Sequence, residues 1–100
     1  MTDSELKELL EQLNIPVAYD HFNKKISPPF MVYRELPNIT LEADNKIYYK
    51  SKAHEIELVT DKKDVILEEQ LETILQNFPY EKQEDEWDSD ENIYHIFYKI

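Results

Sequence analysis

The chain of 100 residues contains no glycine. Glycine adopts positive φ angles without steric cost, so in this chain such turn positions fall to asparagine or aspartate. The same absence excludes the Walker phosphate loop, the dinucleotide-binding fingerprint and the serine nucleophile elbow, which all need glycine at fixed positions. The chain also has no cysteine, which excludes disulfides, thiolate metal sites and cysteine nucleophiles. We therefore expect no enzyme and no cofactor.

A helix is predicted at the start of the chain. Thr2 and Glu5 match the S/T-x-x-E capping box, and Met1 lies where a hydrophobic staple would begin. Leucines at positions 6, 9, 10 and 13 then fall on one face. Asn14 can adopt the left-handed conformation that follows the end of many helices, so the helix is expected to stop near residue 13.

Period-two alternation predicts strands at 46–50 and 54–60 and, more weakly, at 39–43. Apolar runs rich in β-forming residues predict two more, at 30–35 and 93–100. Asp44-Asn45 can form the turn of a hairpin without glycine. The stretch 17–27 has no clear period and is expected to be a loop with one short strand. The closing run IYHIFYKI is apolar on both faces, which is typical of a strand inside a sheet.

A second helix is expected to follow Asp61 or Asp64, either of which can cap it. Its apolar stripe comprises Leu67, Leu71, Ile74, Leu75 and Phe78, and its acids, Glu68, Glu69 and Glu72, are expected on the solvent face. Residues 1–100 are thus predicted to form a single α+β domain. Its antiparallel β-sheet, a meander plus the C-terminal strand, is packed by two amphipathic helices.

The net charge is −11, and it is concentrated in one segment. Residues 81–91 (EKQEDEWDSDE) hold seven acids and one lysine, so the other 89 residues carry only −5. This distribution argues against an extended phosphate-binding face. The segment is expected to be an exposed loop. No run is long and apolar enough for a membrane span, and the N-terminus lacks the basic region of a signal peptide, so we expect a soluble protein made in the cytoplasm.

Two groups of residues are candidates for an interaction surface. One is the acidic loop, with Glu84, Asp85, Trp87, Asp88 and Asp90. The other is a set of strand tyrosines, Tyr33, Tyr48 and Tyr94, because tyrosine is enriched at protein interfaces. Ordinary core packing is the alternative explanation for these tyrosines.

No metal site is expected from the spacing of candidate ligands. Asp88, Asp90 and Asn92 match the first ligand positions of a calcium-binding loop, but Ile93 occupies the position where that loop needs glycine. The three histidines, His21, His54 and His95, form no H-x-x-x-H or H-x-H pair. Partly exposed structural histidines are the expectation, although His54 and His95 could meet on neighbouring strands.

Several segments read together resemble a known family. They are LNIPVAYDHF, SPPFMVYRE, ADNKIYYK, IELVTDKKD leading into LEEQLETIL, PYEK and the closing IYHIFYKI. In this order, from about Leu13 to Ile100, they resemble the tail terminator or head–tail joining (neck) proteins of long-tailed phages and prophages of Gram-positive bacteria. The resemblance implies an α+β subunit of a homomeric ring, of six subunits, that ends the tail tube and joins it to the head or connector.

The resemblance further implies a place in the virion neck, assembly in the host cytoplasm, DNA passing through the ring, and no catalytic residues. Two other classes stay open. An acidic mimic of nucleic acid could inhibit a DNA-binding enzyme, but it needs carboxylates spread along a face. A small hydrolase or metal enzyme is disfavoured because the usual motifs are missing.

Overall fold

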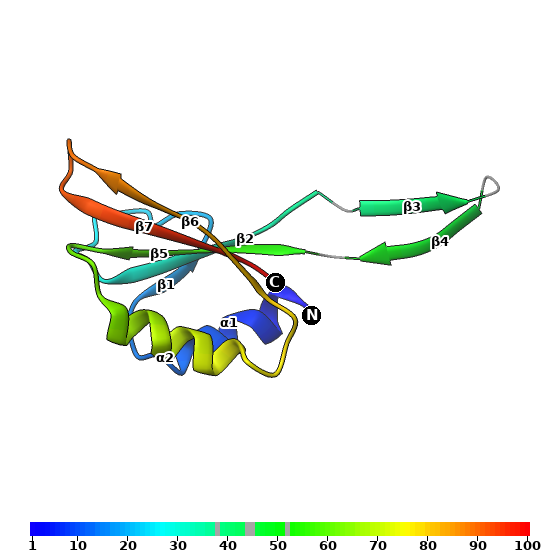
Figure 1. Cartoon of the computed structure of the whole chain (residues 1–100), viewed down its shortest axis with the longest axis horizontal. Coiled ribbons are helices and arrows are strands. Elements are labelled where there is room, and N and C mark those ends of the chain that lie inside the picture. The colour runs from blue at the N-terminus through cyan, green and yellow to red at the C-terminus, as the bar shows by residue number, and fades with distance from the viewer. Residues whose placement is uncertain (38, 44–45, 52) are drawn as a thin grey trace.

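The computed structural model describes residues 1–37, 39–43, 46–51 and 53–100, and the side chains of 1–37 and 53–100. A five-stranded sheet carries two helices on one face, and a two-stranded hairpin extends away from this body (Figure 1). The predicted α+β fold with a sheet packed by helices is confirmed. No helix of the described residues is long and apolar enough to cross a membrane.

The first helix, α1 (Asp3–Glu11), forms as its capping sequence predicts. The backbone N–H of Glu5 donates to Oγ1 of Thr2, and the Thr2 hydroxyl donates to the Glu5 carboxylate, each over 3.1 Å. Asn14 follows with a φ of 58°, so it supplies the left-handed turn after the helix. The other positive φ angles of the described residues belong to Asp20 and Asn92, which confirms that asparagine and aspartate replace glycine at such positions.

The sheet has the order β1-β2-β5-β7-β6. Its strands are β1 (Val17–Tyr19), β2 (Phe30–Glu35), β5 (His54–Thr60), β7 (Ile93–Lys99) and β6 (Glu81–Asp88). β1 runs parallel to β2, and the other neighbouring pairs are antiparallel. The closing strand β7 lies between β5 and β6, which confirms that this apolar run belongs inside the sheet.

The remaining strands, β3 (Ile39–Ala43) and β4 (Lys46–Ser51), pair only with each other, and we call them the arm. The predicted meander is therefore interrupted: β2 pairs directly with β5, and the two strands between them in the sequence form a separate sheet. The backbone N–H of Leu36 donates to the Ala53 carbonyl over 2.8 Å and closes the base of the arm. The expected turn at Asp44-Asn45 lies outside the described residues.

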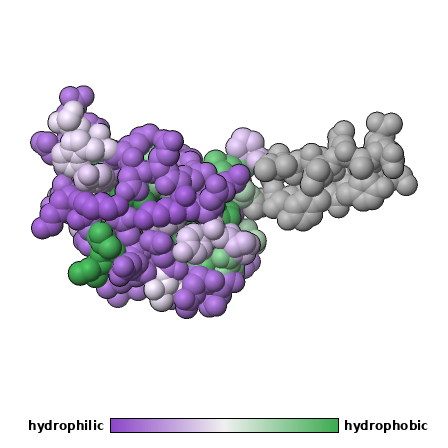
Figure 2. All heavy atoms as spheres, viewed as in Figure 1, coloured by the Kyte–Doolittle hydropathy of each residue, from purple (hydrophilic) through white to green (hydrophobic). Residues whose placement is uncertain are grey.

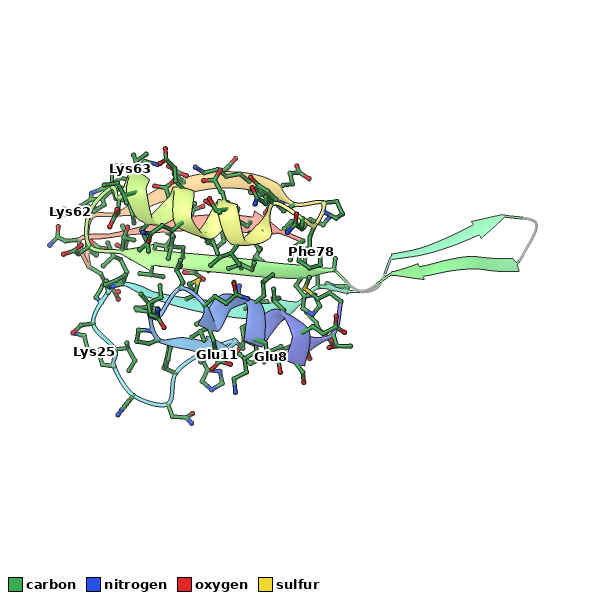
Figure 3. All side chains as sticks on the ribbon, turned by 90° about the horizontal axis from the view of Figure 1, so that it is seen from below. Glu8, Glu11, Lys25, Lys62, Lys63 and Phe78 are labelled. Carbon is green, nitrogen blue, oxygen red and sulfur yellow. The ribbon has the colours of Figure 1, made fainter. Side chains whose placement is uncertain are left out.

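The core lies between the sheet and the two helices, which sit side by side over it (Figure 3). The second helix, α2 (Val65–Leu75), begins where the carboxylate of Asp64 accepts from the backbone N–H of Leu67 over 3.0 Å. The core residues are Leu6, Leu10, Met31, Tyr33, Ile56, Leu58, Leu67, Leu71, Leu75, Ile96 and Tyr98. In each strand they are alternate positions, so one face of the sheet is apolar and covered.

The expectation that Glu68 lies on the solvent face of α2 is wrong. Glu68 is 2% exposed, and its carboxylate lies 2.7 Å from Nζ of Lys82 and 3.1 Å from Nζ of Lys63. Two lysines supplied by other segments compensate the buried charge. Phe78 lies beyond the end of α2 and is exposed, so the apolar stripe ends at Leu75.

The expectation of a loop over residues 81–91 is also wrong for most of that segment. Glu81–Asp88 forms the edge strand β6, and the turn that follows leads into β7. Its side chains are exposed except that of Asp88, which is half-buried, so the predicted exposure is confirmed. Charged side chains on an edge strand discourage unwanted pairing with other chains.

Candidate interaction surface

The face of the sheet opposite the helices, here called the open face, has a different composition from the core face. It carries alternate residues of β5 and β7, among them Glu55, Glu57, His95 and Phe97. Because paired residues of antiparallel strands share a face, Glu86 of β6, opposite His95, also belongs to it. Both helices of the described residues lie on the other side of the sheet (Figure 1).

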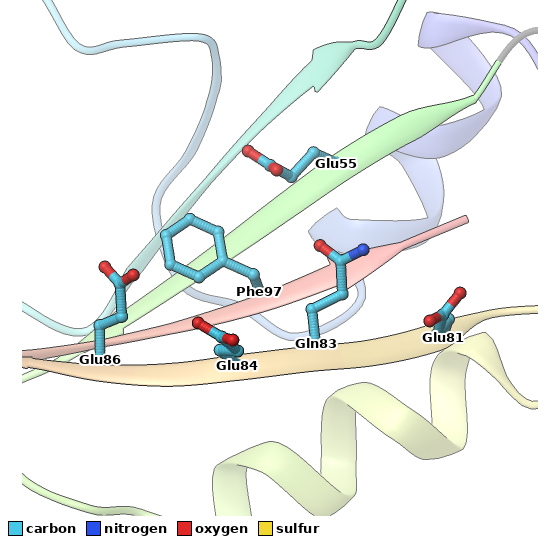
Figure 4. Close-up of a pocket in the computed structure, with 6 residues that line it drawn as sticks. All are labelled: Glu55, Glu81, Gln83, Glu84, Glu86 and Phe97. Carbon is cyan, nitrogen blue, oxygen red and sulfur yellow. The ribbon is translucent and has the colours of Figure 1, made fainter. Parts of the chain in front are cut away.

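An acidic hollow of about 520 Å³ lies on the open face. Figure 4 shows its six lining residues, which come from β5, β6 and β7: Glu55, Glu81, Gln83, Glu84, Glu86 and Phe97. The register of β6 shifts between Lys82 and Asp85, and this irregularity lets the neighbours Gln83 and Glu84 both line the hollow. Four carboxylates thus surround one aromatic ring, an arrangement that suits a partner segment with basic and apolar side chains.

Beside the acidic hollow, Arg34 contacts three carboxylates, two from β5 and one from the residue that follows β1. Its guanidinium contacts Glu55, Glu57 (3.6 Å) and Asp20 (3.2 Å). Hydrogen bonds from His21 and then from Arg34 lower the pKa of Asp20. The Glu57 carboxylate also meets Nδ1 of His95. Glu55 and Glu57 are therefore partly neutralised.

The acids that β6 contributes to the hollow are less compensated. Within the described residues, Glu81, Glu84 and Glu86 have no cation within ion-pair distance. On β7, Lys99 lies opposite Glu81 and Glu55 in register, and His95 lies opposite Glu86. The negative charge of the open face is consequently strongest along β6.

A second and larger groove, of about 810 Å³, lies at the other end of the open face. The segment between β1 and β2 forms one wall, where Phe22 packs edge-to-face on Phe30 with ring centroids 5.4 Å apart. The turn with Asp90 and Glu91 forms the opposite wall, and Arg34 lies in the floor. The groove therefore extends the charged surface to the loop side of the sheet.

The structure separates the acidic residues singled out in the sequence. Glu84 lines the acidic hollow, but Asp85 lies on the helix side of β6 and pairs with Lys63. Asp88 ends β6, and its carboxylate accepts from the backbone N–H groups of Asp90 (3.0 Å) and Glu91 (3.3 Å). Asp88 thus holds a turn, and Asp90 is exposed within that turn.

The aromatic candidates also separate. Tyr33 is 5% exposed and packs edge-to-face on Tyr19, so it is a core residue and its assignment to a contact surface is wrong. Tyr94 is half-buried, and its ring centroid lies 4.9 Å from that of Trp87, which is 48% exposed. Tyr48 belongs to β4, whose side chains lie outside the described part of the structure.

The histidines do not converge. His54 lies on the core face of β5 and is fully buried, which corrects the expectation of partial exposure, whereas His95 lies on the open face of β7 and is half-buried. The two therefore face opposite sides of the sheet. His21 is exposed beside Asp20.

Sequence reasoning missed Glu55, Glu81, Glu86, Phe97 and Arg34. The available signal is the alternation in residues 54–60, which places Glu55 and Glu57 on the face opposite Ile56 and Leu58. The strand β6 gave no apolar alternation because both of its faces are polar. Around the body, the surface seen in Figure 2 is mainly hydrophilic.

The chain matches no protein-family model, and no curated protein matches it.

Proposed function

We propose that the protein is a structural subunit of the neck of a long-tailed phage, where a homomeric ring ends the tail tube and joins it to the head. The resemblance of the segments from Leu13 to Ile100 suggests this role, with six subunits in the ring. The structural observation that carries the proposal is the arm. This two-stranded hairpin projects from a compact body and, among the described residues, forms a sheet separate from the five-stranded one (Figure 1).

An isolated two-stranded hairpin is only marginally stable in water. The arm would therefore be stabilised by contact with another molecule, and a second copy of the chain carries a suitable surface. Residues 46–52 (KIYYKSK) contain three lysines, two tyrosines and no acid, whereas the acidic hollow presents carboxylates around Phe97. A closed ring requires that one patch on each subunit contacts a different patch on the next subunit.

The charge of the body fits the same role. Carboxylates along β6 would line or border an opening through which DNA passes without adhering, because like charges repel. The partners are then a second copy of the chain, the tail tube protein and a head or connector protein.

The test uses assembled tail tubes, to which the purified full chain is added. The proposal predicts rings at one end of each tube by negative-stain electron microscopy. Glu84→Lys with Glu86→Lys, on the open face, should abolish ring formation while the chain stays folded by circular dichroism. The matched control reverses Glu8 and Glu11, two exposed acids of α1 (Figure 3), and should leave ring formation intact. Binding along the tube wall, or no binding to tubes or heads, would contradict the neck role.

A second candidate function is an acidic mimic of nucleic acid that inhibits a DNA-binding enzyme. The observation in its favour is that Glu81, Glu84 and Glu86 lie on an extended, exposed strand and not in a loop. Strand residues two apart, such as Glu84 and Glu86, are separated by about 6.6 Å, and Glu81 lies on the same strand beyond the register shift. Stoichiometric displacement of DNA from such an enzyme by the free chain, lost in the Glu84→Lys/Glu86→Lys variant, would favour this function over the ring.

A further inference from the structure

Three metal-ligating side chains meet where the arm joins the body, and they are far apart in the sequence. Asp3 comes from the first turn of α1, Glu35 from the last residue of β2 and His54 from the first residue of β5. One ligand atom from each lies within 4.8 Å of the other two. We propose that these residues form a binding site for a divalent transition-metal ion, with Zn²⁺ as the best match.

His54 is the rigid member of this site. Its side chain is 1% exposed, and its backbone exchanges hydrogen bonds with Ile100 over 2.8 and 2.9 Å. Nε2 points to Asp3, 2.7 Å from the Oδ1 atom, while Nδ1 is buried without a hydrogen-bond partner in the described residues. The buried ring therefore directs its single polar contact into the cluster.

The two carboxylates lie on backbones that are fixed by hydrogen bonds, and their side chains are accessible to solvent. Glu35 is the register partner of His54, and its backbone N–H donates to the Tyr19 hydroxyl over 3.1 Å. Asp3 is held by the capped start of α1, and its side chain is 43% exposed. Both side chains reach solvent, so an ion can enter and water can complete its coordination.

The geometry needs only a small adjustment. Zinc binds imidazole nitrogen and carboxylate oxygen at about 2.0–2.2 Å, so tetrahedral ligands lie roughly 3.4 Å apart. Rotation of the exposed Asp3 and Glu35 side chains, while His54 stays in place, would bring the three atoms to that spacing. An open fourth position for water is usual in zinc sites with three protein ligands.

The donor set selects the class of ion. Imidazole nitrogen favours zinc and its transition-metal neighbours, whereas Mg²⁺ and Ca²⁺ prefer all-oxygen sites. Two carboxylates supply the charge that balances a dication. A bound ion would tie α1 to the ends of β2 and β5 and so stiffen the base of the arm, whether or not the protein acts in a phage neck.

The test is calorimetric titration of the metal-free full chain with Zn²⁺, and separately with Mg²⁺. We expect one saturable Zn²⁺ site, a higher unfolding midpoint with Zn²⁺, and at least tenfold weaker binding of Mg²⁺. Asp3→Asn and Glu35→Gln, both at solvent-accessible side chains, should each weaken Zn²⁺ binding at least tenfold while the chain stays folded.

The matched controls are His21→Gln and His95→Gln, which remove histidines that contact a single carboxylate each. They should leave Zn²⁺ affinity unchanged. The proposal is overturned if Zn²⁺ does not bind saturably, if neither Asp3→Asn nor Glu35→Gln weakens binding, or if a control variant abolishes it.

Discussion

The ammonium group of Lys82 lies 2.7 Å from Oε1 of Glu68, a carboxylate almost completely hidden from solvent. This ion pair joins the edge strand β6 to α2. Within the sheet of the described residues β6 pairs with β7. The ion pair, together with the contact of Asp85 with Lys63, links this edge strand to the helix layer.

Replacing Lys82 with methionine should lower the free energy of unfolding by about 1–3 kcal/mol, because a buried carboxylate loses a charged partner and keeps only Lys63. Urea unfolding followed by circular dichroism measures the change. Lys62→Met is the matched control, since Lys62 is an exposed lysine next to Lys63 in the sequence. It should change the free energy of unfolding by less than about 0.5 kcal/mol. Equal effects of the two variants would show that the Lys82 contact contributes nothing.

Stability should decrease as the pH rises above about 10. Burial raises the pKa of the Tyr98 hydroxyl above its ordinary value of 10.0. The ammonium group of Lys63 donates a hydrogen bond to Asp85, and that of Lys82 donates one to Glu68. These bonds raise the pKa values of both lysines above 10.5. In this range the folded chain binds more protons than the unfolded chain, so unfolding is favoured as the pH increases.

Thermal unfolding between pH 8 and pH 11.5 tests this sign. The midpoint should be level below pH 10 and fall above it. Tyr98→Phe keeps the ring and removes the hydroxyl that donates to Glu72 over 3.1 Å, so its midpoint should fall less steeply. A midpoint that stays constant up to pH 11 would exclude the linkage.

Glu68 illustrates why the sequence predicts elements better than side-chain surroundings. The period of α2 correctly identified Leu67, Leu71 and Leu75, but a glutamate beside this stripe was assigned to solvent from its charge alone. Its partners, Lys63 and Lys82, lie five residues before it and 14 after it. Only the tertiary packing of β6 on α2 brings Lys82 to Glu68.

The strand β6 escaped prediction for a related reason. Hydrophobic alternation identifies a strand with one buried face, and an edge strand with two polar faces has none. The signal available in the sequence for the end of β6 was its turn-forming residues, Asp88 and Asn92. In the structure, the Asp88 carboxylate accepts from two backbone N–H groups, and Asn92 has a φ of 56°. Likewise, the sequence predicted the strands of the arm but not their departure from the sheet, since the same alternation suits either placement.

Moderate salt should stabilise the fold. The exposed acids of β6 repel one another in a chain with a net charge of −11, and salt screens such repulsion over a Debye length of about 10 Å at 0.1 M. The unfolding midpoint should therefore rise between 10 mM and 150 mM sodium chloride. In Glu84→Gln/Glu86→Gln the rise should be smaller. A midpoint that falls with salt would mean that the surface ion pairs outweigh the repulsion.

The two faces of β7 should respond differently to truncation. Ile96 is fully buried among the core residues, whereas Ile93 is half-buried on the open face. Ile96→Ala should lower the free energy of unfolding by about 2–5 kcal/mol, and Ile93→Ala by about 1 kcal/mol. Removal of residues 96–100 should abolish folding, because β7 bridges β5 and β6. A shortened chain with a native-like thermal transition would contradict the central place of β7.

The arm should be dispensable for folding and required for assembly. Leu36 and Ala53 already pair at its base, so an Asn-Gly turn in place of residues 37–52 would close β2 and β5 as a tight hairpin. Loop closure becomes entropically less costly when the loop is shorter. The free energy of unfolding of this variant should therefore equal or slightly exceed that of the full chain.

The same variant should no longer form rings on tail tubes, because in the ring that we propose the arm supplies one of the two patches of the interface. Urea unfolding and electron microscopy of the same preparation separate the two effects. A loss of more than about 2 kcal/mol would show that the arm belongs to the folded core. A stable armless chain that still caps tubes would mean that another part of the body, such as the acidic hollow, makes the ring contact without the arm.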